Sequence, residues 1–216
     1  MGKTNYIFGY GSLIEKESRM RTTPEAQIVH PVIVKGFKRG WFARTGVYTL
    51  STTFLGCVSD ENALVNGVIY KISDEDLPLL DKREANYKRK LINPEKIEFL
   101  SDLDDLDCAI WVYTNTFTSE RELLKNVPDK NFPIVQSYVD ICINGCLEIE
   151  QEFEKAKEIG FAQMFIESTA YWNTFWANDR IYPRRPFIHR PNANTIDNYL
   201  KTYLQDKTLF DQIYIE

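Results

Sequence analysis

The sequence predicts an α+β fold in which a mixed, barrel-like sheet is surrounded by helices. Strand-like segments fill roughly the first 115 residues, and helical spacing dominates after Thr116. Too few helices separate the strand-like segments for a doubly wound parallel sheet, so a mixed sheet fits better. With 44% hydrophobic and 13% aromatic residues, the chain has enough apolar side chains for a core, which excludes a disordered protein.

The expected strands are short and largely apolar. Val68, Tyr70 and Ile72 alternate by twos, as a half-buried strand requires. The expected strands cover residues 5–8, 29–35, 36–42, 52–58, 65–72, 91–99 and 108–113.

One helix interrupts this strand-rich part. Ser73, Asp74 and Asp76 place capping oxygens and negative charge where a helix N-terminus favours both. Pro78 is tolerated only in the first helical turn, so we expect the helix to begin between Asp74 and Asp76.

The remainder of the chain has the spacing of helices. Ser119 is placed to cap a helix over 120–125, and a second helix over 134–145 is expected to end at Gly145. Further helices are expected over 147–159 and 161–176, and Asn194 is placed to cap the last one. We therefore expect two parts, a domain over residues 1–117 and a helical C-terminal extension over 118–216 that packs on it.

Composition excludes several classes of partner. The 26 basic and 31 acidic residues give a net charge of 26 − 31 = −5, which argues against nucleic acid because phosphate-binding surfaces need clustered Lys and Arg. No stretch approaches the roughly 20 apolar residues of a membrane helix, and the N-terminus lacks the layout of a signal peptide. We expect a cytoplasmic protein with no membrane partner; its oligomeric state is left open.

The four cysteines are too few for a disulfide scaffold and indicate a reducing compartment. Cys142 and Cys146 are four residues apart, which would place them on one face of a helix. A structural zinc needs four ligands at short paired spacings, and neither His30 nor His189 lies near this pair in sequence. We expect buried thiols and no metal site.

Two glycines directly follow the first expected strand, in Phe8-Gly9-Tyr10-Gly11-Ser12-Leu13-Ile14. Closely spaced glycines let several backbone N–H groups point into one concavity, which is a natural site for an anion. Ile14 stands where a dinucleotide-binding motif needs its third Gly or Ala, and the Gly-Lys-Ser/Thr of a phosphate loop is absent. The alternative is an ordinary turn.

Glu84 lies in Leu80-Asp81-Lys82-Arg83-Glu84-Ala85-Asn86-Tyr87, where four of eight residues are charged. Taken alone, such a segment is more typical of a solvated helix end than of a catalytic carboxylate.

Together, the segment FGYGSL, the strand VNGVIYKI and the segment LDKREANY, about 70 residues after the first, resemble the γ-glutamylcyclotransferase-like superfamily. That superfamily includes ChaC-type and AIG2-like proteins, and the resemblance spans residues 5–115. It implies the corresponding fold and an enzyme that cyclises a γ-glutamyl group to 5-oxoproline. The amine, amino acid or peptide attached to that group is released, and the reaction needs no cofactor or metal.

The resemblance also implies roles for individual residues. Glu84 corresponds to the catalytic acid/base, whose pKa should be raised by roughly two units through burial. Tyr87 would orient this carboxylate, and an aromatic residue of the last strand, Tyr113 in preference to Trp111, would line the site. The expected substrate cradle consists of Gly9, Tyr10, Gly11, Ser12 and Leu13.

The sequence departs from the ChaC-type pattern, because Glu15 follows Ile14 and an H-R-G-T run is missing. Glutathione is therefore not the favoured substrate. Six residues of the extension could close over the pocket and select the substrate: Trp172, Trp176, Asp179, Arg180, Arg184 and Arg185. We favour the alternative in which the two tryptophans pack in the core and the arginines lie on the surface. Two alternatives to an enzyme remain, a non-catalytic module that binds a small carboxylate or γ-glutamyl ligand, and a protein-interaction module.

Overall fold

The computed structural model describes residues 4–44, 51–84, 87–103, 108–184 and 192–215. The strands are β1 (Thr4–Gly9), β2 (Val29–Arg44), β3 (Thr53–Ile72), β4 (Tyr87–Leu91), β5 (Ile97–Phe99), β6 (Cys108–Asn115), β7 (Ile134–Val135), β8 (Thr169–Ala170), β9 (Trp176–Asn178) and β10 (Tyr214–Ile215). The α-helices are α1 (Lys16–Thr22), α2 (Asp76–Arg83), α3 (Glu120–Leu124), α4 (Gln136–Glu152), α5 (Glu154–Glu158), α6 (Phe161–Ser168) and α7 (Ala193–Tyr203). The 3-10 helices are η1 (Ser12–Ile14), η2 (Pro94–Lys96) and η3 (Phe210–Gln212).

Seven strands form the main sheet, in the order β4-β6-β1-β3-β2-β5 with β8 also pairing with β2. The sheet is mixed, because β1 runs parallel to β6 and antiparallel to β3. The prediction of an α+β fold with a mixed sheet is confirmed. Within the described part of the chain the edge strands β4 and β5 do not pair, so the sheet is not closed into a barrel.

Two of the strands are longer than predicted. The expected strands over 29–35 and 36–42 form a single strand, β2, and those over 52–58 and 65–72 join in β3. Gly36, with φ of +89°, accompanies a shift in the β2–β3 register, so it bends a continuous strand where a break was expected. The predicted strand over 91–99 is wrong, because Pro94 begins η2 and separates β4 from β5.

The first two helices expected from the sequence, α2 and α3, begin where their caps indicate, whereas α1 was not predicted. α2 starts at Asp76, and the Ser119 hydroxyl accepts a hydrogen bond from the Glu122 N–H at the start of α3. The later helix boundaries were predicted less well. The expected helix over 161–176 ends at Ser168, and Asn192, not Asn194, is the N-cap of α7.

The predicted end of a helix at Gly145 is wrong, because α4 continues to Glu152. A Cβ atom at Gly145 would lie 2.4 Å from the Glu15 backbone nitrogen and 2.8 Å from the Ile14 carbonyl carbon. The glycine therefore allows the middle of the helix to approach the chain just after the glycine-rich loop.

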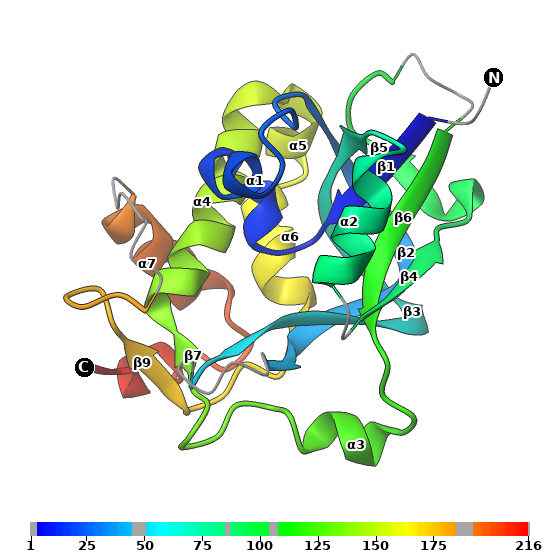
Figure 1. Cartoon of the computed structure of the whole chain (residues 1–216). Coiled ribbons are helices and arrows are strands. Elements are labelled where there is room, and N and C mark those ends of the chain that lie inside the picture. The colour runs from blue at the N-terminus through cyan, green and yellow to red at the C-terminus, as the bar shows by residue number, and fades with distance from the viewer. Residues whose placement is uncertain (1–3, 45–50, 85–86, 104–107, 185–191, 216) are drawn as a thin grey trace.

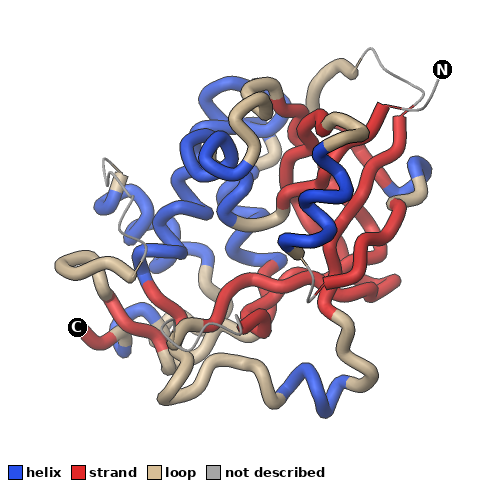
Figure 2. The backbone as a smooth tube through the Cα atoms, in the orientation of Figure 1, coloured by secondary structure: helices blue, strands red, loops and turns tan. Residues whose placement is uncertain are grey.

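Helices α4, α6 and α7 gather on one side of the molecule and the main sheet lies on the other (Figures 1 and 2). One buried cluster contains side chains of both parts, including Trp41 from β2, Tyr138 from α4, Phe165 from α6 and Trp176 from β9. The N-terminal strands and the C-terminal helices thus bury apolar surface against each other. No helix in the described ranges is long and apolar enough to cross a membrane.

Candidate functional site

The glycine-rich loop leaves three consecutive amides available. β1 ends at Gly9, and the Gly11 carbonyl accepts a hydrogen bond of 3.0 Å from the Ile14 N–H, which closes η1. Within the described residues, the N–H groups of Gly11, Ser12 and Leu13 donate no hydrogen bond. Gly11 is buried, and buried amides usually have a partner, so this loop can bind an anionic or carbonyl oxygen.

Close packing fixes the path of the loop. A Cβ atom at Gly67 of β3 would lie 2.4 Å from the Gly9 carbonyl oxygen, so the two backbones meet only because this position is glycine. On the other side, Nη1 of the buried Arg19 donates to the carbonyl oxygens of Leu13 at 3.1 Å and of Ile14 at 2.8 Å. The loop is therefore held from both sides and presents its amides in a fixed arrangement.

A second buried arginine reaches this loop from the sheet. Arg39 of β2 donates from Nη1 to the Tyr10 carbonyl oxygen at 3.2 Å and to the Asn66 carbonyl oxygen at 2.8 Å. Its guanidinium carbon lies 3.8 Å from the centre of the Phe165 ring. Sequence reasoning missed Arg39, because the same strand also carries Lys35 and Lys38 and its charge alone does not distinguish it.

Glu84 lies at the C-terminal end of α2. Its N–H donates to the Leu80 carbonyl at 2.8 Å, and its carbonyl accepts from the Tyr87 N–H at 2.8 Å. The Glu84 side chain is half-buried. Burial is the main cause that raises the pKa of Tyr10, Tyr87 and Tyr113, and the charge of Glu84 adds a smaller contribution to each, so Glu84 lies within electrostatic range of all three.

The three tyrosines are engaged with one another and with nearby polar groups. The Tyr10 hydroxyl donates to the Tyr113 carbonyl oxygen at 3.0 Å, and the Tyr113 hydroxyl donates to Asp81 Oδ1 at 2.8 Å. Tyr87 pairs with Asn115 in the β4–β6 register, and the Asn115 side chain partly offsets the effect of burial on the Tyr87 pKa. Burial raises the pKa of Tyr87 to about 12 and the pKa values of Tyr10 and Tyr113 well above 10, so all three remain neutral at neutral pH.

The other aromatic candidate on β6 lies elsewhere. Trp111 donates from its indole N–H to Asn5 Oδ1 at 2.7 Å, and the guanidinium of Arg89 lies 4.5 Å from its ring centre. Tyr113 is thus the candidate of this strand that lies near Glu84.

Two apolar or aromatic residues near Gly11 were not identified from the sequence. A Cβ atom at Gly11 would lie 3.1 Å from the Tyr138 hydroxyl oxygen and 3.7 Å from Leu55 Cβ. The Tyr138 ring packs edge-to-face against Phe54 at 5.0 Å and Trp41 at 5.9 Å. Helical spacing marks Tyr138 only as a core residue, so no sequence signal distinguished it as part of the site.

The residues of the extension that were considered as a cover for the pocket have structural partners. The rings of Trp172 and Trp176 stack with centres 5.0 Å apart. The helix expected over 161–176 does not reach either residue. Arg180 binds Asp140 and Asp197, and Asp179 accepts from the Ser137 N–H at 2.7 Å and from its hydroxyl at 2.6 Å. The Arg184 N–H also donates to Asp179, at 2.7 Å, and Arg185 lies outside the described residues.

The cysteines are free thiols, and Cys57, Cys142 and Cys146 are buried. Burial raises the pKa of the Cys57 thiol to about 12, which keeps it protonated and unreactive at neutral pH. Across the described ranges, no three His, Cys, Asp or Glu side chains group as metal ligands.

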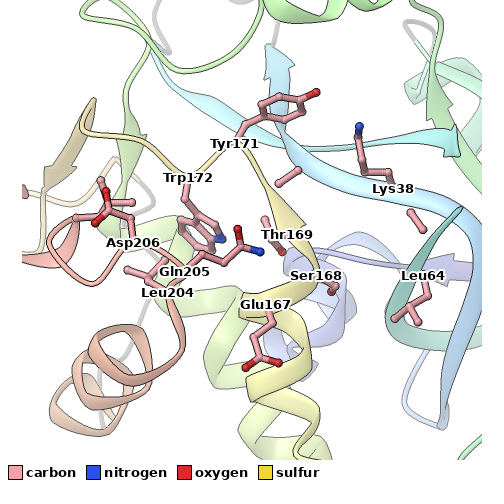
Figure 3. A pocket seen from close by; sticks show the side chains of 13 residues that line it. Lys38, Leu64, Glu167, Ser168, Thr169, Tyr171, Trp172, Leu204, Gln205 and Asp206 are labelled. Atoms are coloured by element: carbon pink, nitrogen blue, oxygen red, sulfur yellow. The ribbon is translucent and has the colours of Figure 1, made fainter.

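A separate surface pocket of about 490 Å³ lies beyond α6 (Figure 3). Its walls come from three regions of the chain: the end of α6 with the segment up to Trp172, the segment after α7, and the neighbouring part of β2 and β3. None of the site residues predicted from the sequence lines it. Ser168 and Thr169 of its wall also accept hydrogen bonds from Arg39, at 2.9 and 2.8 Å.

The raised pKa of Tyr87 predicts a loss of stability at alkaline pH. A tyrosine in the unfolded chain ionises near pH 10, whereas Tyr87 in the folded protein ionises near pH 12. The stabilising contribution of its bound proton is complete below pH 10 and is lost as the pH rises to 12. We expect the free energy of unfolding, measured in urea, to fall more steeply over this range for the wild type than for Tyr87→Phe. Equal slopes would contradict this account.

Comparison with known proteins identifies a family. The sequence model of the family described as "Gamma-glutamyl cyclotransferase, AIG2-like" matches residues 7–133. A solved structure named "Gamma-glutamyl cyclotransferase" is 16% identical with a TM-score of 0.51, covering 73% of this chain and 87% of the other. A human protein described as uncharacterized is also 16% identical, with a TM-score of 0.50 and the same coverage. At this identity the structural likeness establishes the fold alone. No curated protein matches the sequence.

Proposed function

The chain belongs to the gamma-glutamyl cyclotransferase, AIG2-like family, and from that premise we propose that it converts the γ-glutamyl group of a small cytoplasmic compound to 5-oxoproline. The attached amine, amino acid or peptide is the other product. The observation that supports the proposal is that Glu84 is close enough for its charge to act on Tyr10, the residue that precedes three amides which donate no hydrogen bond in the described chain.

The proposed reaction is a ring closure within one molecule. The α-nitrogen forms a bond to the γ-carbonyl carbon, and the bond from that carbon to the leaving nitrogen breaks. The α-ammonium loses two protons and the leaving nitrogen gains two, so the reaction consumes no net proton. Because nucleophile and electrophile belong to one substrate, holding the bent conformer supplies much of the rate.

Glu84 is the group that we propose moves these protons. Two carboxylates lie near the tyrosines of the site, and Asp81 accepts from the Tyr113 hydroxyl at 2.8 Å and pairs with Arg89 at 3.0 Å. The tyrosines keep their protons at neutral pH, so the proton carrier is a carboxylate, and we assign this role to Glu84. A carboxylate at this position accepts a proton from the α-ammonium and returns it to the leaving nitrogen. General acid–base catalysis of this kind contributes about 10²–10⁴ in rate.

The glycine-rich loop is proposed to bind the substrate oxygen atoms. The N–H groups of Gly11, Ser12 and Leu13 are held in place before the ligand arrives, so they stabilise a carboxylate or a developing oxyanion without reorganisation. Tyr10, Tyr87 and Tyr113 would form the walls around Glu84, and Tyr138 and Leu55 the wall beside Gly11.

A direct assay tests the proposed activity. We expect 5-oxoproline to accumulate when the protein is incubated with a panel of γ-glutamyl amino acids and γ-glutamyl amines, detected by mass spectrometry. α-Glutamyl isomers of the same compounds are the matched control, since their ring-closing geometry differs, and should give no product. Saturable binding of γ-glutamyl compounds without any 5-oxoproline would favour a non-catalytic binding module.

A further inference from the structure

We propose that Arg39 is a positioning residue of this site, which orients the Tyr10–Gly11 peptide and supplies the positive charge that selects ligands with a free carboxylate. The inference rests on the proposed function. It adds a residue from β2, outside the glycine-rich loop and the Glu84 segment, and it narrows the substrate class to γ-glutamyl compounds whose α-carboxylate is unmodified.

The charge of Arg39 is buried without an opposite charge to compensate it in the described part of the chain. The Arg39 side chain has no exposed surface. Its hydrogen-bond acceptors in the described ranges are all neutral oxygens, from backbone carbonyls, two hydroxyls and one amide. Burial lowers the pKa of Arg39 to about 10, so the group is still charged at neutral pH. A buried charge without an opposite charge is unfavourable, and an anionic ligand would compensate it.

The hydrogen bond from Arg39 to the Tyr10 carbonyl oxygen also determines the direction of the Gly11 N–H. The described chain has no cis peptide, so the C=O and N–H of the Tyr10–Gly11 peptide point in opposite directions. Nη1 of Arg39 holds the Tyr10 carbonyl oxygen at 3.2 Å, which turns the Gly11 N–H away from the guanidinium. A charged donor on the carbonyl polarises the peptide and makes this N–H a stronger donor.

Arg39 itself is held by residues of the C-terminal part of the chain. Nη2 donates to the Phe165 carbonyl oxygen at 2.8 Å and to the Ser168 hydroxyl at 2.9 Å, and Nε donates to the Thr169 hydroxyl at 2.8 Å. Figure 3 shows Ser168 and Thr169 where α6 leads into the next segment. These acceptors lie beyond residue 133, where the family match ends. Arg39 therefore connects the glycine-rich loop to the C-terminal helices.

These three points define the preferred ligand. A positive charge behind the loop attracts a carboxylate bound to the loop amides and gives no such advantage to a neutral carboxamide of the same shape. 5-Oxoproline and its carboxamide differ in this group alone, so they are suitable probes that bind without turnover.

The test is a binding experiment on the full chain. ¹⁵N-labelled protein is titrated with L-5-oxoproline or its carboxamide, and the amide signals of Gly11, Ser12 and Leu13 are followed by NMR. The wild type should bind the acid at least tenfold more tightly than the carboxamide. In Arg39→Met this preference should fall below threefold. Arg44→Met, the same substitution further along β2, should retain the wild-type preference.

Arg39→Lys, which conserves the charge, keeps the proposal testable if Arg39→Met does not fold. Arg39→Lys keeps the positive charge but has fewer donors, so we expect it to prefer the acid while binding it at least fivefold more weakly, with a shifted Gly11 signal. Wild-type affinity and an unmoved Gly11 signal in Arg39→Lys would overturn the positioning role. A folded Arg39→Met with the full preference for the acid, or a wild type with no preference, would overturn the charge role.

The result of this binding experiment can be distinguished from the result of the 5-oxoproline assay. If the wild type shows the Arg39-dependent preference but forms no 5-oxoproline from any γ-glutamyl compound, the catalytic proposal fails and the inference about Arg39 stands. If the wild type forms 5-oxoproline but binds acid and carboxamide equally, the inference fails and the catalytic proposal stands.

Discussion

Glu84→Gln is expected to reduce 5-oxoproline formation by at least a thousandfold, near the upper end of what a general acid–base contributes. The amide of Gln retains the shape of the side chain but does not accept a proton at neutral pH. Steady-state rates measured with the best γ-glutamyl substrate check this, and the Kd for 5-oxoproline should change by less than about threefold.

Glu75→Gln is the matched control for this variant, because Glu75 is an exposed glutamate at the opposite end of α2. Its activity should equal that of the wild type. A Glu84→Gln protein that retains a tenth or more of the wild-type rate would remove Glu84 from the mechanism.

Gly145→Ala is expected to destabilise the protein by about 2–3 kcal/mol, the range found when atoms are inserted into close-packed sites. The new Cβ would lie 2.4 and 2.6 Å from the Glu15 nitrogen and Cα. These are backbone atoms, so no side-chain rotation relieves the overlap. In an ordinary helix the same substitution stabilises by up to about 1 kcal/mol, so the sign of the effect is diagnostic.

Urea unfolding measures this difference in the free energy of unfolding. Gln151→Ala, at an exposed position of the same helix, is the control and should change stability by less than about 0.5 kcal/mol. A Gly145→Ala protein as stable as the wild type would mean that α4 and the Ile14–Glu15 backbone are farther apart than described.

Local signals in the sequence predicted the parts of the fold that depend on local energetics. Ser73 before α2 and Ser119 before α3 accept hydrogen bonds from amide groups of the adjoining turn, so the sequence identifies these helix starts directly. The local pattern predicts element boundaries at Gly36 and Gly145, whereas Gly36 lies in a bend of β2 and Gly145 at a contact between α4 and the Ile14–Glu15 backbone. The need for glycine at these positions comes from distant parts of the chain, which local patterns do not report.

For the candidate site too, the sequence indicated the local segments but not the residues that reach them from distant parts of the chain. The two segments named by the resemblance lie together, with Glu84 beside Tyr10, Tyr87 and Tyr113. Tyr138 and Arg39 reach the loop through long-range packing and long-range hydrogen bonds, and nothing in their neighbouring residues indicates this. The roles assigned to the individual residues remain predictions until the variants are measured.

The position of β1 in the middle of the main sheet has a consequence for how the chain acquires its structure. β1 pairs with β3 on one side and with β6 on the other. During synthesis, this first strand cannot complete its hydrogen bonding until residues 108–115 have left the ribosome. Pairings this distant in sequence carry a large loop-closure cost and slow the search for the native state. Until then the nascent protein exposes an unpaired strand edge that can pair with other chains. Chaperone binding during this period would protect it from aggregation.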